Sequence, residues 1–342
     1  MSGRPDAEVT PVAGRVGERA PLVEIRNLAK HFPVRSGLLQ RVSGHLRALD
    51  GVDLTIDDGQ CLGIVGESGS GKSTLARALL RVWPVTRGSI RIRGEDGAVR
   101  DWAALSESEL RPLRRSASMV FQDPYGSLNP RLTVGDCIGE PLLIAGVPRA
   151  EREARCAELI AAVGLMPEHL RRHPHAFSGG QRQRIVIARA LALRPRLLVC
   201  DEPVSALDVS VQAQVLNLLG ELRQRYRLAM LFITHDLKVV RHLCESVAVM
   251  YAGRIVEQAP TAELFAAPRH PYTRALIAAA PSPDPTVRST RQLLAGEVPD
   301  PTRPAPGCAF APRCPRAAAA CRAALPPLVE ADGRRLRCLD PV

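Results

Sequence analysis

The stretch GESGSGKST (66–74) constrains the fold of this 342-residue chain more than any other feature. It has the pattern G-x4-G-K-[ST], follows the apolar segment QCLGIV (60–65), and precedes an Ala- and Leu-rich stretch (74–82). In such a loop, glycines let backbone N–H groups surround a phosphate, the lysine supplies a positive charge, and a hydroxyl can hold Mg²⁺. We therefore expect a strand, a nucleotide-binding loop and a helix in an α/β fold. The expected contacts are Gly66, Glu67, Ser68, Gly69, Ser70, Gly71, Lys72, Ser73 and Thr74.

A second apolar segment, LLVCDEP (197–203), ends in two adjacent carboxylates. A carboxylate that ends a buried strand completes the magnesium site beside a phosphate loop, and we assign this role to Asp201 together with Ser73. The neighbouring Glu202 can accept a proton from water as a general base. An acidic pair at the end of a strand can also be a solvated loop, but the upstream phosphate loop favours nucleoside triphosphate hydrolysis.

The segment FSGGQRQR (177–184) opens a long helical stretch and allows two interpretations. Ser178 and Gln181 fit a capping box, which is a purely structural role. A helix N-terminus with two glycines, here Gly179 and Gly180, is also a site where a phosphate can bind.

In this segment the sequence resembles ABC-type ATPases, whose signature is LSGGQ; Phe177 departs from its first position. Other motifs of that family follow in the same order. They are Phe32 in AKHFP, Gln122 after SMVF (118–121), Asp208 in SALD, and His235 in FITHD. The resemblance implies an α/β ABC ATPase core with a mostly parallel sheet over about 60–122 and 195–250, an N-terminal antiparallel β layer and a helical signature subdomain.

The resemblance also implies roles for these residues. Phe32 would stack on adenine, Gln122 would link Mg²⁺ to the membrane-subunit contact surface, and His235 would touch the γ-phosphate. ATP held by a partner subunit would be bound by Ser178, Gly179, Gly180 and Gln181. Asp208 would lie at the interface between the two subunits. Catalytic roles fall on Lys72, Glu202 and His235, and the magnesium ligands would be Ser73, Gln122 and Asp201. The cofactors are ATP and Mg²⁺.

The chain divides into three parts on this interpretation. Residues 1–20 are polar and form a leader, residues 21–280 form the nucleotide-binding domain, and residues 281–342 form a Pro- and Cys-rich extension. The helical subdomain is expected at about 123–178. Because prolines are frequent after Pro281, we expect the extension to be largely irregular, apart from a short helix opened by Pro315 and running through 324.

Three local features resemble the oligopeptide/dipeptide permeases. They are QDPYGSLNPRLTVGDCI (122–138), HPYTRALIAAAP (270–281) and the insertion VRSGLLQRVSGHLRALDGV (34–52), which favours the F-type over the D-type ATPase subunit. The resemblance implies an importer in which this chain pairs with a second ABC ATPase, a D-type relative. Its other partners would be two transmembrane permease subunits and an extracytoplasmic solute-binding protein. The chain would then be peripheral, at the cytoplasmic face of the inner membrane.

The sequence motifs also allow other functions. Nickel and glutathione importers share the subfamily motifs. The net charge of +11 could mark a soluble ABC ATPase that acts on nucleic acid. The chain has one set of motifs and no sustained heptads, so we expect no nucleic-acid partner. A phosphotransferase would leave SGGQ and SALD without a role, and an idle Glu202 would make the chain a pure binding module.

Nine cysteines fall into two groups. Cys61, Cys137, Cys156, Cys200 and Cys244 stand singly among apolar neighbours and are expected to be small buried hydrophobic residues. Cys308, Cys314, Cys321 and Cys338 cluster in the extension with C-x5-C-x6-C-x16-C spacing. Four thiols could form disulfides, stay free, bind zinc or hold a 4Fe-4S cluster. Some peptide-permease ATPases carry such a cluster, and the resemblance favours it here, with zinc as the alternative.

Overall fold

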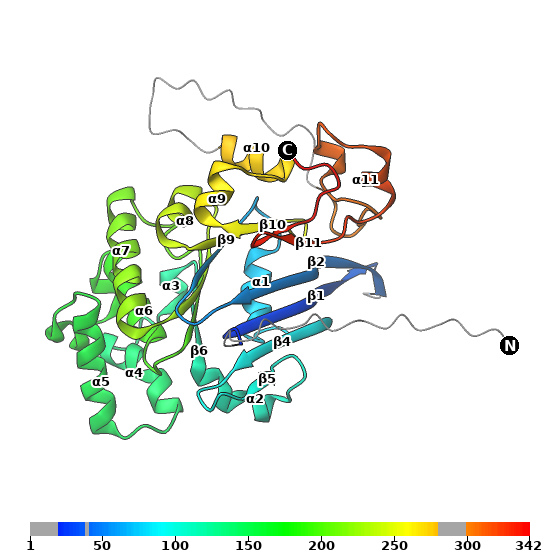
Figure 1. Cartoon of the computed structure of the whole chain (residues 1–342). Coiled ribbons are helices and arrows are strands. Elements are labelled where there is room, and N and C mark those ends of the chain that lie inside the picture. The colour runs from blue at the N-terminus through cyan, green and yellow to red at the C-terminus, as the bar shows by residue number, and fades with distance from the viewer. Residues whose placement is uncertain (1–19, 38–40, 280–298) are drawn as a thin grey trace.

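The computed structural model describes residues 20–37, 41–279 and 299–342. The expected leader lies outside these residues except for Ala20, and so does the start of the extension, 281–298. The described parts form two sheets flanked by helices. In Figure 1 the helices α4 to α7 lie at the left, the antiparallel sheet at the right, and the C-terminal segment above it.

The larger sheet forms the centre of the molecule. Its eight strands run in the order β11-β12-β10-β9-β3-β8-β7-β6 in the described residues. Their bounds are β3 (Cys61–Val65), β6 (Ala117–Val120), β7 (Leu197–Asp201), β8 (Ala229–Ile233), β9 (Ser246–Tyr251), β10 (Arg254–Pro260), β11 (Val329–Ala331) and β12 (Arg334–Leu336). The pairs β6·β7, β7·β8, β3·β8 and β3·β9 are parallel, which confirms the predicted parallel core.

The smaller sheet is antiparallel, in the order β2-β1-β4-β5. Its strands are β1 (Val23–Ser36), β2 (Arg41–Ile56), β4 (Arg87–Arg93) and β5 (Val99–Asp101). It confirms the predicted N-terminal β layer, and β1 and β2 are long strands of 14 and 16 residues. The insertion 34–52 mostly extends this hairpin, in which Phe32 pairs with Leu46 and Val34 with Gly44.

Helices connect the strands and cover the sheets. The α-helices are α1 (Lys72–Leu79), α2 (Glu107–Leu113), α3 (Pro124–Ser127), α4 (Val134–Ile144), α5 (Arg149–Ala162), α6 (Gly179–Ala190), α7 (Val209–Tyr226), α8 (Leu237–Leu243), α9 (Thr261–Ala266), α10 (Pro271–Ala279) and α11 (Ala319–Ala323). Short 3₁₀ turns are η1 (Arg114–Ser116), η2 (Pro167–Arg171), η3 (Pro174–Ala176) and η4 (Ala311–Arg313). Within the described residues, no helix is long and apolar enough to cross a bilayer.

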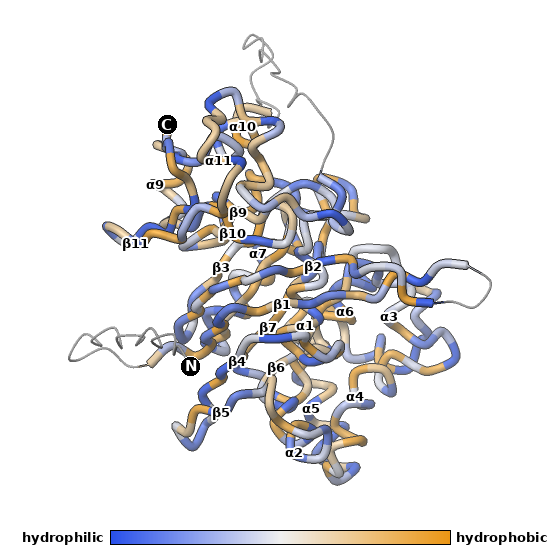
Figure 2. The backbone as a smooth tube through the Cα atoms, turned by 90° about the vertical axis from the view of Figure 1, so that its right-hand side faces the viewer, coloured by the Kyte–Doolittle hydropathy of each residue, from blue (hydrophilic) through white to orange (hydrophobic). Residues whose placement is uncertain are grey.

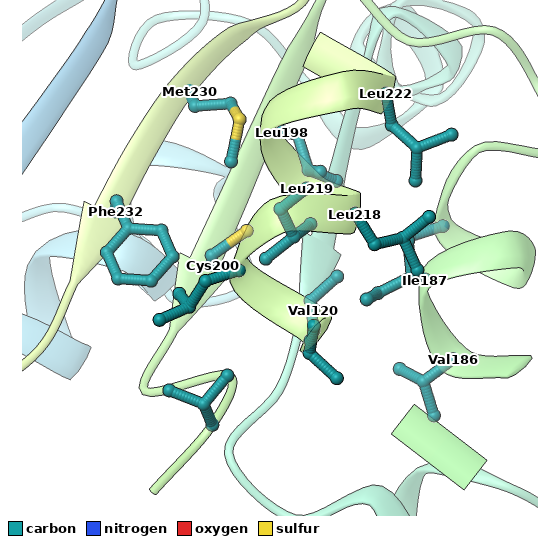
Figure 3. Close-up of a cluster of buried hydrophobic side chains, with 14 of the residues drawn as sticks. Val120, Val186, Ile187, Leu198, Cys200, Leu218, Leu219, Leu222, Met230 and Phe232 are labelled. Carbon is teal, nitrogen blue, oxygen red and sulfur yellow. The ribbon is translucent and has the colours of Figure 1, made fainter. Parts of the chain in front are cut away.

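The core lies on both faces of the parallel strands because successive side chains of a strand point to opposite faces. Leu198 and Cys200 of β7 pack on the side of α6 and α7, whereas Leu197 and Val199 pack toward α1 and the antiparallel sheet. Figure 3 shows the first of these clusters, with residues of α7 such as Leu219 facing the sheet. Figure 2 shows the distribution of hydropathy along the chain, with apolar residues in the interior strands and hydrophilic ones on outer loops.

The described part of the extension is mostly without regular structure, as expected, but it also contains two short strands that were not expected. Strand β12 pairs with β10, with Glu257 opposite Leu336, and so adds the extension to the central sheet. The predicted helix from Pro315 is also shorter than expected, since α11 begins at Ala319. Strands of three residues leave no readable alternation in a sequence, because they place two residues on one face and one on the other.

An aromatic cluster fixes the extension to the core. Its members come from β9, the segment before and in α10, and the extension, and all are almost fully buried: Tyr251, His270, Tyr272 and Phe310. The ring of Phe310 lies 5.4 Å from those of Tyr251 and Tyr272 and 5.9 Å from that of His270, between centroids. The His-Pro-Tyr motif therefore forms one side of the socket that receives Phe310.

His270 gives the fold a predictable acid sensitivity. Burial lowers the pKa of His270 from 6.5 to about 4, and its Nδ1 accepts a hydrogen bond from the backbone N–H of Tyr272 at 3.0 Å. Between these two pH values the unfolded chain binds more protons at this residue than the folded one, so acid favours unfolding. From pH 7 to pH 5 we expect this residue to remove about 2 kcal/mol from the free energy of unfolding.

Urea denaturation at both pH values checks this expectation. The variant His270→Asn retains an acceptor for the Tyr272 N–H but does not titrate in this range, so its loss of stability should be smaller by that amount. Equal losses in the two proteins would show that His270 is not the source.

Candidate nucleotide-binding site

A cavity of about 760 Å³ opens over the phosphate loop. It lies at the carboxyl ends of the parallel strands β3, β6, β7 and β8. The segments that carry the predicted residues follow these strands directly. Because the strands are parallel, these segments meet at one edge of the sheet, the usual place for ligands in such folds. The predicted residues that line the cavity are Phe32, Ser68, Gly69, Gly71, Lys72, Ser73, Thr74, Gln122, Glu202 and His235.

The phosphate loop turns tightly into helix α1. Gly71 has φ of 105°, in the left-handed region, and a Cβ at this position would lie 2.4 Å from the carbonyl oxygen of Ala48. Only glycine fits there without moving the backbone. The Nζ atom of Lys72 donates hydrogen bonds to the carbonyl oxygens of Gly66 at 2.8 Å and Glu67 at 2.9 Å. Burial lowers the pKa of Lys72, and the nearby carboxylates of Glu202 and Asp201 oppose this change.

Two oxygen groups converge beside this lysine. The hydroxyl of Ser73 donates a hydrogen bond to Oδ1 of Asp201 at 2.9 Å, although 128 residues separate them in the sequence. Asp201 is 2% exposed, and burial raises its pKa, opposed by the Ser73 hydrogen bond. Carboxylates and hydroxyls are the ligands that Mg²⁺ prefers, and both lie beside the loop that would hold the phosphates. The donor set present therefore fits Mg²⁺.

Glu202 lies at the centre of a polar group. Its Oε2 atom accepts a hydrogen bond from Nε2 of Gln122 at 3.3 Å, and Nδ1 of His235 lies 3.3 Å from the same oxygen. Glu202 has φ of 48°, a conformation that is uncommon for residues other than glycine and that concentrates at functional sites. The arrangement brings together a carboxylate, an amide and an imidazole from three different segments, as the sequence predicted.

Phe32, which belongs to β1, lines the same cavity. Trp83 packs against it edge to face, with 5.2 Å between ring centroids, and Nζ of Lys30 lies 4.8 Å from its ring centre. Trp83 fixes the plane of the Phe32 ring, which is half-buried and lines the cavity. An aromatic ring held in this way can stack on a flat base.

The signature residues Ser178 to Gln181 lie at the start of α6, away from this cavity. Ser178 caps α6: its Oγ accepts from the N–H of Gln181 at 3.3 Å, and Oε1 of Gln181 accepts from the N–H of Ser178 at 3.1 Å. The predicted capping box is therefore confirmed. A Cβ on Gly180 would lie 2.3 Å from Cγ1 of Val211, so close packing against α7 also requires this glycine. Within the described residues, Ser178, Gly179, Gly180, Gln181 and Asp208 do not line the cavity of their own chain.

The sequence did not reveal several parts of the cavity wall. They come from β2, from the β9–β10 turn and from the extension: Leu46, Arg47, Ala48, Ala252, Gly253, Pro299, Asp300 and Pro301. The backbone N–H of Arg47 donates to the carbonyl oxygen of Pro301 at 3.0 Å, which fixes the extension to this wall. No local pattern signals this contact, since it joins two segments far apart in the sequence.

The cysteines follow the predicted division in part. Cys61, Cys137, Cys156, Cys200 and Cys244 are buried, as expected, while the four cysteines of the extension are half-buried and free. Burial raises the pKa of Cys308 and of Cys338, and neighbouring thiols of the set raise both further. The described part of the chain nevertheless holds no group of three or more His, Cys, Asp or Glu side chains placed to bind a metal ion. The geometry therefore gives no support to the expected 4Fe-4S cluster or to zinc.

Comparison with family models identifies both halves of the chain. Residues 49–205 match the model described as ABC transporter, and residues 256–321 match the model described as oligopeptide/dipeptide transporter, C-terminal region. The first range contains the phosphate loop, the signature and the Asp201–Glu202 pair. The second contains the His-Pro-Tyr segment and three of the four extension cysteines.

Individual relatives are similar along most of the chain. A probable peptide ABC transporter ATP-binding protein of Sinorhizobium fredii is 51% identical over 319 residues, which cover 93% of this chain and 89% of that protein. The di/tripeptide transport ATP-binding protein DppF of Pseudomonas aeruginosa is 50% identical over 92% of this chain and 95% of its own length.

The fold has solved counterparts as well. The dimeric ATP-binding cassette MJ0796, in a post-hydrolysis state with ADP and phosphate, has a TM-score of 0.60 and 29% identity, and covers 70% of this chain and 98% of its own. The identities and the coverage confirm the resemblance that the motifs indicated. The chain is an ATPase that belongs to the ABC transporter ATP-binding proteins, in the group that carries the oligopeptide/dipeptide transporter C-terminal region.

Proposed function

We propose that this ATPase powers a membrane importer of di- or oligopeptides. The observation that carries the proposal is the convergence of Lys72, Glu202 and His235 in one cavity of a chain that is about 50% identical to peptide transport ATP-binding proteins. Nickel or glutathione import would use the same cavity. The names of the relatives and the match to the oligopeptide/dipeptide region favour peptides.

The roles of the site residues follow from their chemistry. Lys72 holds the β- and γ-phosphates, and its contacts with loop carbonyls keep it aligned until they bind. Glu202 takes a proton from the attacking water, and His235, whose Nδ1 lies 3.3 Å from that carboxylate, contacts the γ-phosphate. Ser73 and Asp201, with Gln122, would hold Mg²⁺, which offsets the charge of the phosphates when bound.

A second subunit completes the site in this proposal. The signature residues Ser178 to Gln181 form a helix N-terminus whose N–H groups suit a phosphate, yet they do not line the cavity of their own chain in the part that the structure describes. A facing ATPase, a D-type relative, would receive them against its ATP, with Asp208 at the seam. ATP then favours the closed pair because it contacts both subunits only there, and hydrolysis reopens it.

A groove beside Gln122 suits a permease segment. Phe121, next to Gln122, lines a cavity of about 290 Å³ together with Pro141 of α4 and Arg189 of α6. Close by, Leu143 and Ile144 of α4 are 59% and 68% exposed, which is unusual for large apolar residues unless a partner covers them. We assign the groove to a cytoplasmic segment of one permease subunit. A solute-binding protein on the other side of the membrane would deliver the peptide, and this chain would be peripheral at the cytoplasmic face of the inner membrane.

Purification from solubilised membranes tests this assembly. An affinity tag on this chain should recover a second ABC ATPase and two hydrophobic permease subunits in equal amounts. Recovery of nucleic acid or ribosomal proteins in their place would contradict the transporter assignment and favour a soluble ATPase.

We also propose that the four extension thiols bind iron as a 4Fe-4S cluster, with zinc as the alternative. The support is the presence of four cysteines at C-x5-C-x6-C-x16-C spacing, since four thiolates are a suitable donor set for iron, together with the resemblance to peptide-permease ATPases. In the described residues the thiols are not arranged as a metal-binding group, so the cluster would have to draw them together. Protein purified without oxygen should absorb broadly in the visible range and contain iron. A colourless protein with one zinc per chain would favour zinc, and one without metal would refute both.

A further inference from the structure

The phosphate loop is in direct contact with the C-terminal extension. Arg313 donates from Nη1 to Oε2 of Glu67 at 2.8 Å and from Nη2 to Oε1 at 3.0 Å, across 246 residues of sequence. This is the paired geometry in which a guanidinium binds a carboxylate most specifically. The Arg313 side chain is 6% exposed and that of Glu67 26%, so water screens the pair only in part.

The backbone of Glu67 is held at the same place. Its N–H donates to the hydroxyl of Tyr272 at 2.9 Å, and its carbonyl oxygen accepts from Nζ of Lys72 at 2.9 Å. The hydroxyl of Tyr251 in turn accepts from Nη1 of Arg313 at 3.2 Å. Glu67 is therefore fixed through its side chain and both backbone groups, and one of these contacts reaches the lysine that binds phosphate.

Arg313 itself is firmly placed. It ends the turn η4, where its N–H donates to the carbonyl oxygen of Phe310 at 2.9 Å, and Phe310 is 1% exposed in the aromatic cluster. The N–H of Cys308, at the start of this segment, donates to the carbonyl oxygen of Cys321 at 2.7 Å. The guanidinium therefore reaches the loop from a segment that packs firmly against the core.

We propose that Arg313 is a positioning residue for the phosphate loop: it holds Glu67 and neutralises a carboxylate that would otherwise repel the triphosphate. The charge argument is direct, because Glu67 belongs to the loop that surrounds the phosphates. The Glu67 side chain is not among the described residues that line the cavity, so its charge acts on the triphosphate from behind the loop; without its guanidinium partner it is an unpaired negative charge on that loop. The inference rests on nucleotide binding alone and is independent of which solute is transported.

Nucleotide affinity in the full-length chain tests the inference. With a fluorescent ATP analogue as probe, Arg313→Gln should weaken binding about tenfold, as the loss of a charged hydrogen bond does. In steady-state assays the KM for ATP should rise while kcat stays within about twofold, because no group in contact with the reacting atoms has changed. Adding Glu67→Gln to Arg313→Gln should restore most of the affinity, since the repelling charge is then gone.

A matched control lies three residues away. Arg316 makes the same type of paired contact with Asp340, at 3.0 and 2.7 Å, but both side chains are about half exposed and neither touches the loop. Arg316→Gln should leave ATP affinity unchanged. The inference is overturned if Arg313→Gln binds ATP as well as the wild type, or if Glu67→Gln fails to restore affinity in the double variant. The second outcome would mean that Arg313 only stabilises the extension.

Discussion

Replacing Glu202 with glutamine should reduce steady-state ATP hydrolysis about 10²- to 10⁴-fold while ATP binding persists. The amide keeps the size of the side chain and an oxygen that can accept from Gln122 and His235, which lie 3.3 Å from the present carboxylate. It cannot accept a proton from water, so the attack on the γ-phosphate loses its base. Phosphate release and binding of a fluorescent ATP analogue measure the two effects separately.

The variant Glu168→Gln, which alters an exposed carboxylate in η2, is a suitable control and should behave as the wild type. If Glu202→Gln turned over ATP at a near-normal rate, another group would have to be the base. A variant that lost binding as well would show that Glu202 supports the cavity and would leave its catalytic role without evidence.

The change with the largest effect on binding is expected at Gly71. In Gly71→Ala the new methyl group meets the Ala48 carbonyl oxygen at 2.4 Å, and the residue must also hold φ of 105°. Because a backbone atom cannot move aside easily, the loop itself must shift, and its N–H groups lose their alignment with the phosphates. We expect ATP affinity to fall about a hundredfold, an effect of the size that a displacement of about 1 Å within a site can have.

Gly97→Ala separates this steric effect from backbone strain. Gly97 has φ of 77° and lies on an exposed turn, where an added methyl group would meet no atom within 4 Å, so the variant carries strain without a clash. This variant should lose about 1–2 kcal/mol of stability and bind ATP normally. Normal binding by Gly71→Ala would contradict the close fit of the loop against β2.

The nucleotide site could be predicted because its parts are short and local. A buried strand, a glycine loop and a helix predict the position of Lys72, and a second buried strand predicts that of Asp201. Parallel pairing of β3, β8 and β7 then brings these ends to one edge. The Ser73–Asp201 hydrogen bond and the position of His235 beside Glu202 follow from this arrangement.

The role of the extension could not be predicted in the same way. Arg313 and Glu67 have no local pattern that connects them, and the pairing of β12 with β10 involves too few residues to show alternation. The cysteine spacing predicts a metal site in this region and gives no sign of a contact with the phosphate loop. In the structure, the residues between the cysteines, Phe310 and Arg313, make the contacts with the core.

The most direct test of the proposed function is ATP-driven uptake of a labelled di- or oligopeptide into proteoliposomes that hold the complete transporter with its binding protein. We predict that uptake requires ATP, and that it stops when this chain carries Glu202→Gln. A complex that hydrolyses ATP and accumulates nickel or glutathione but no peptide would contradict peptide import. Undiminished uptake with Glu202→Gln would contradict the central claim that hydrolysis at this site drives transport.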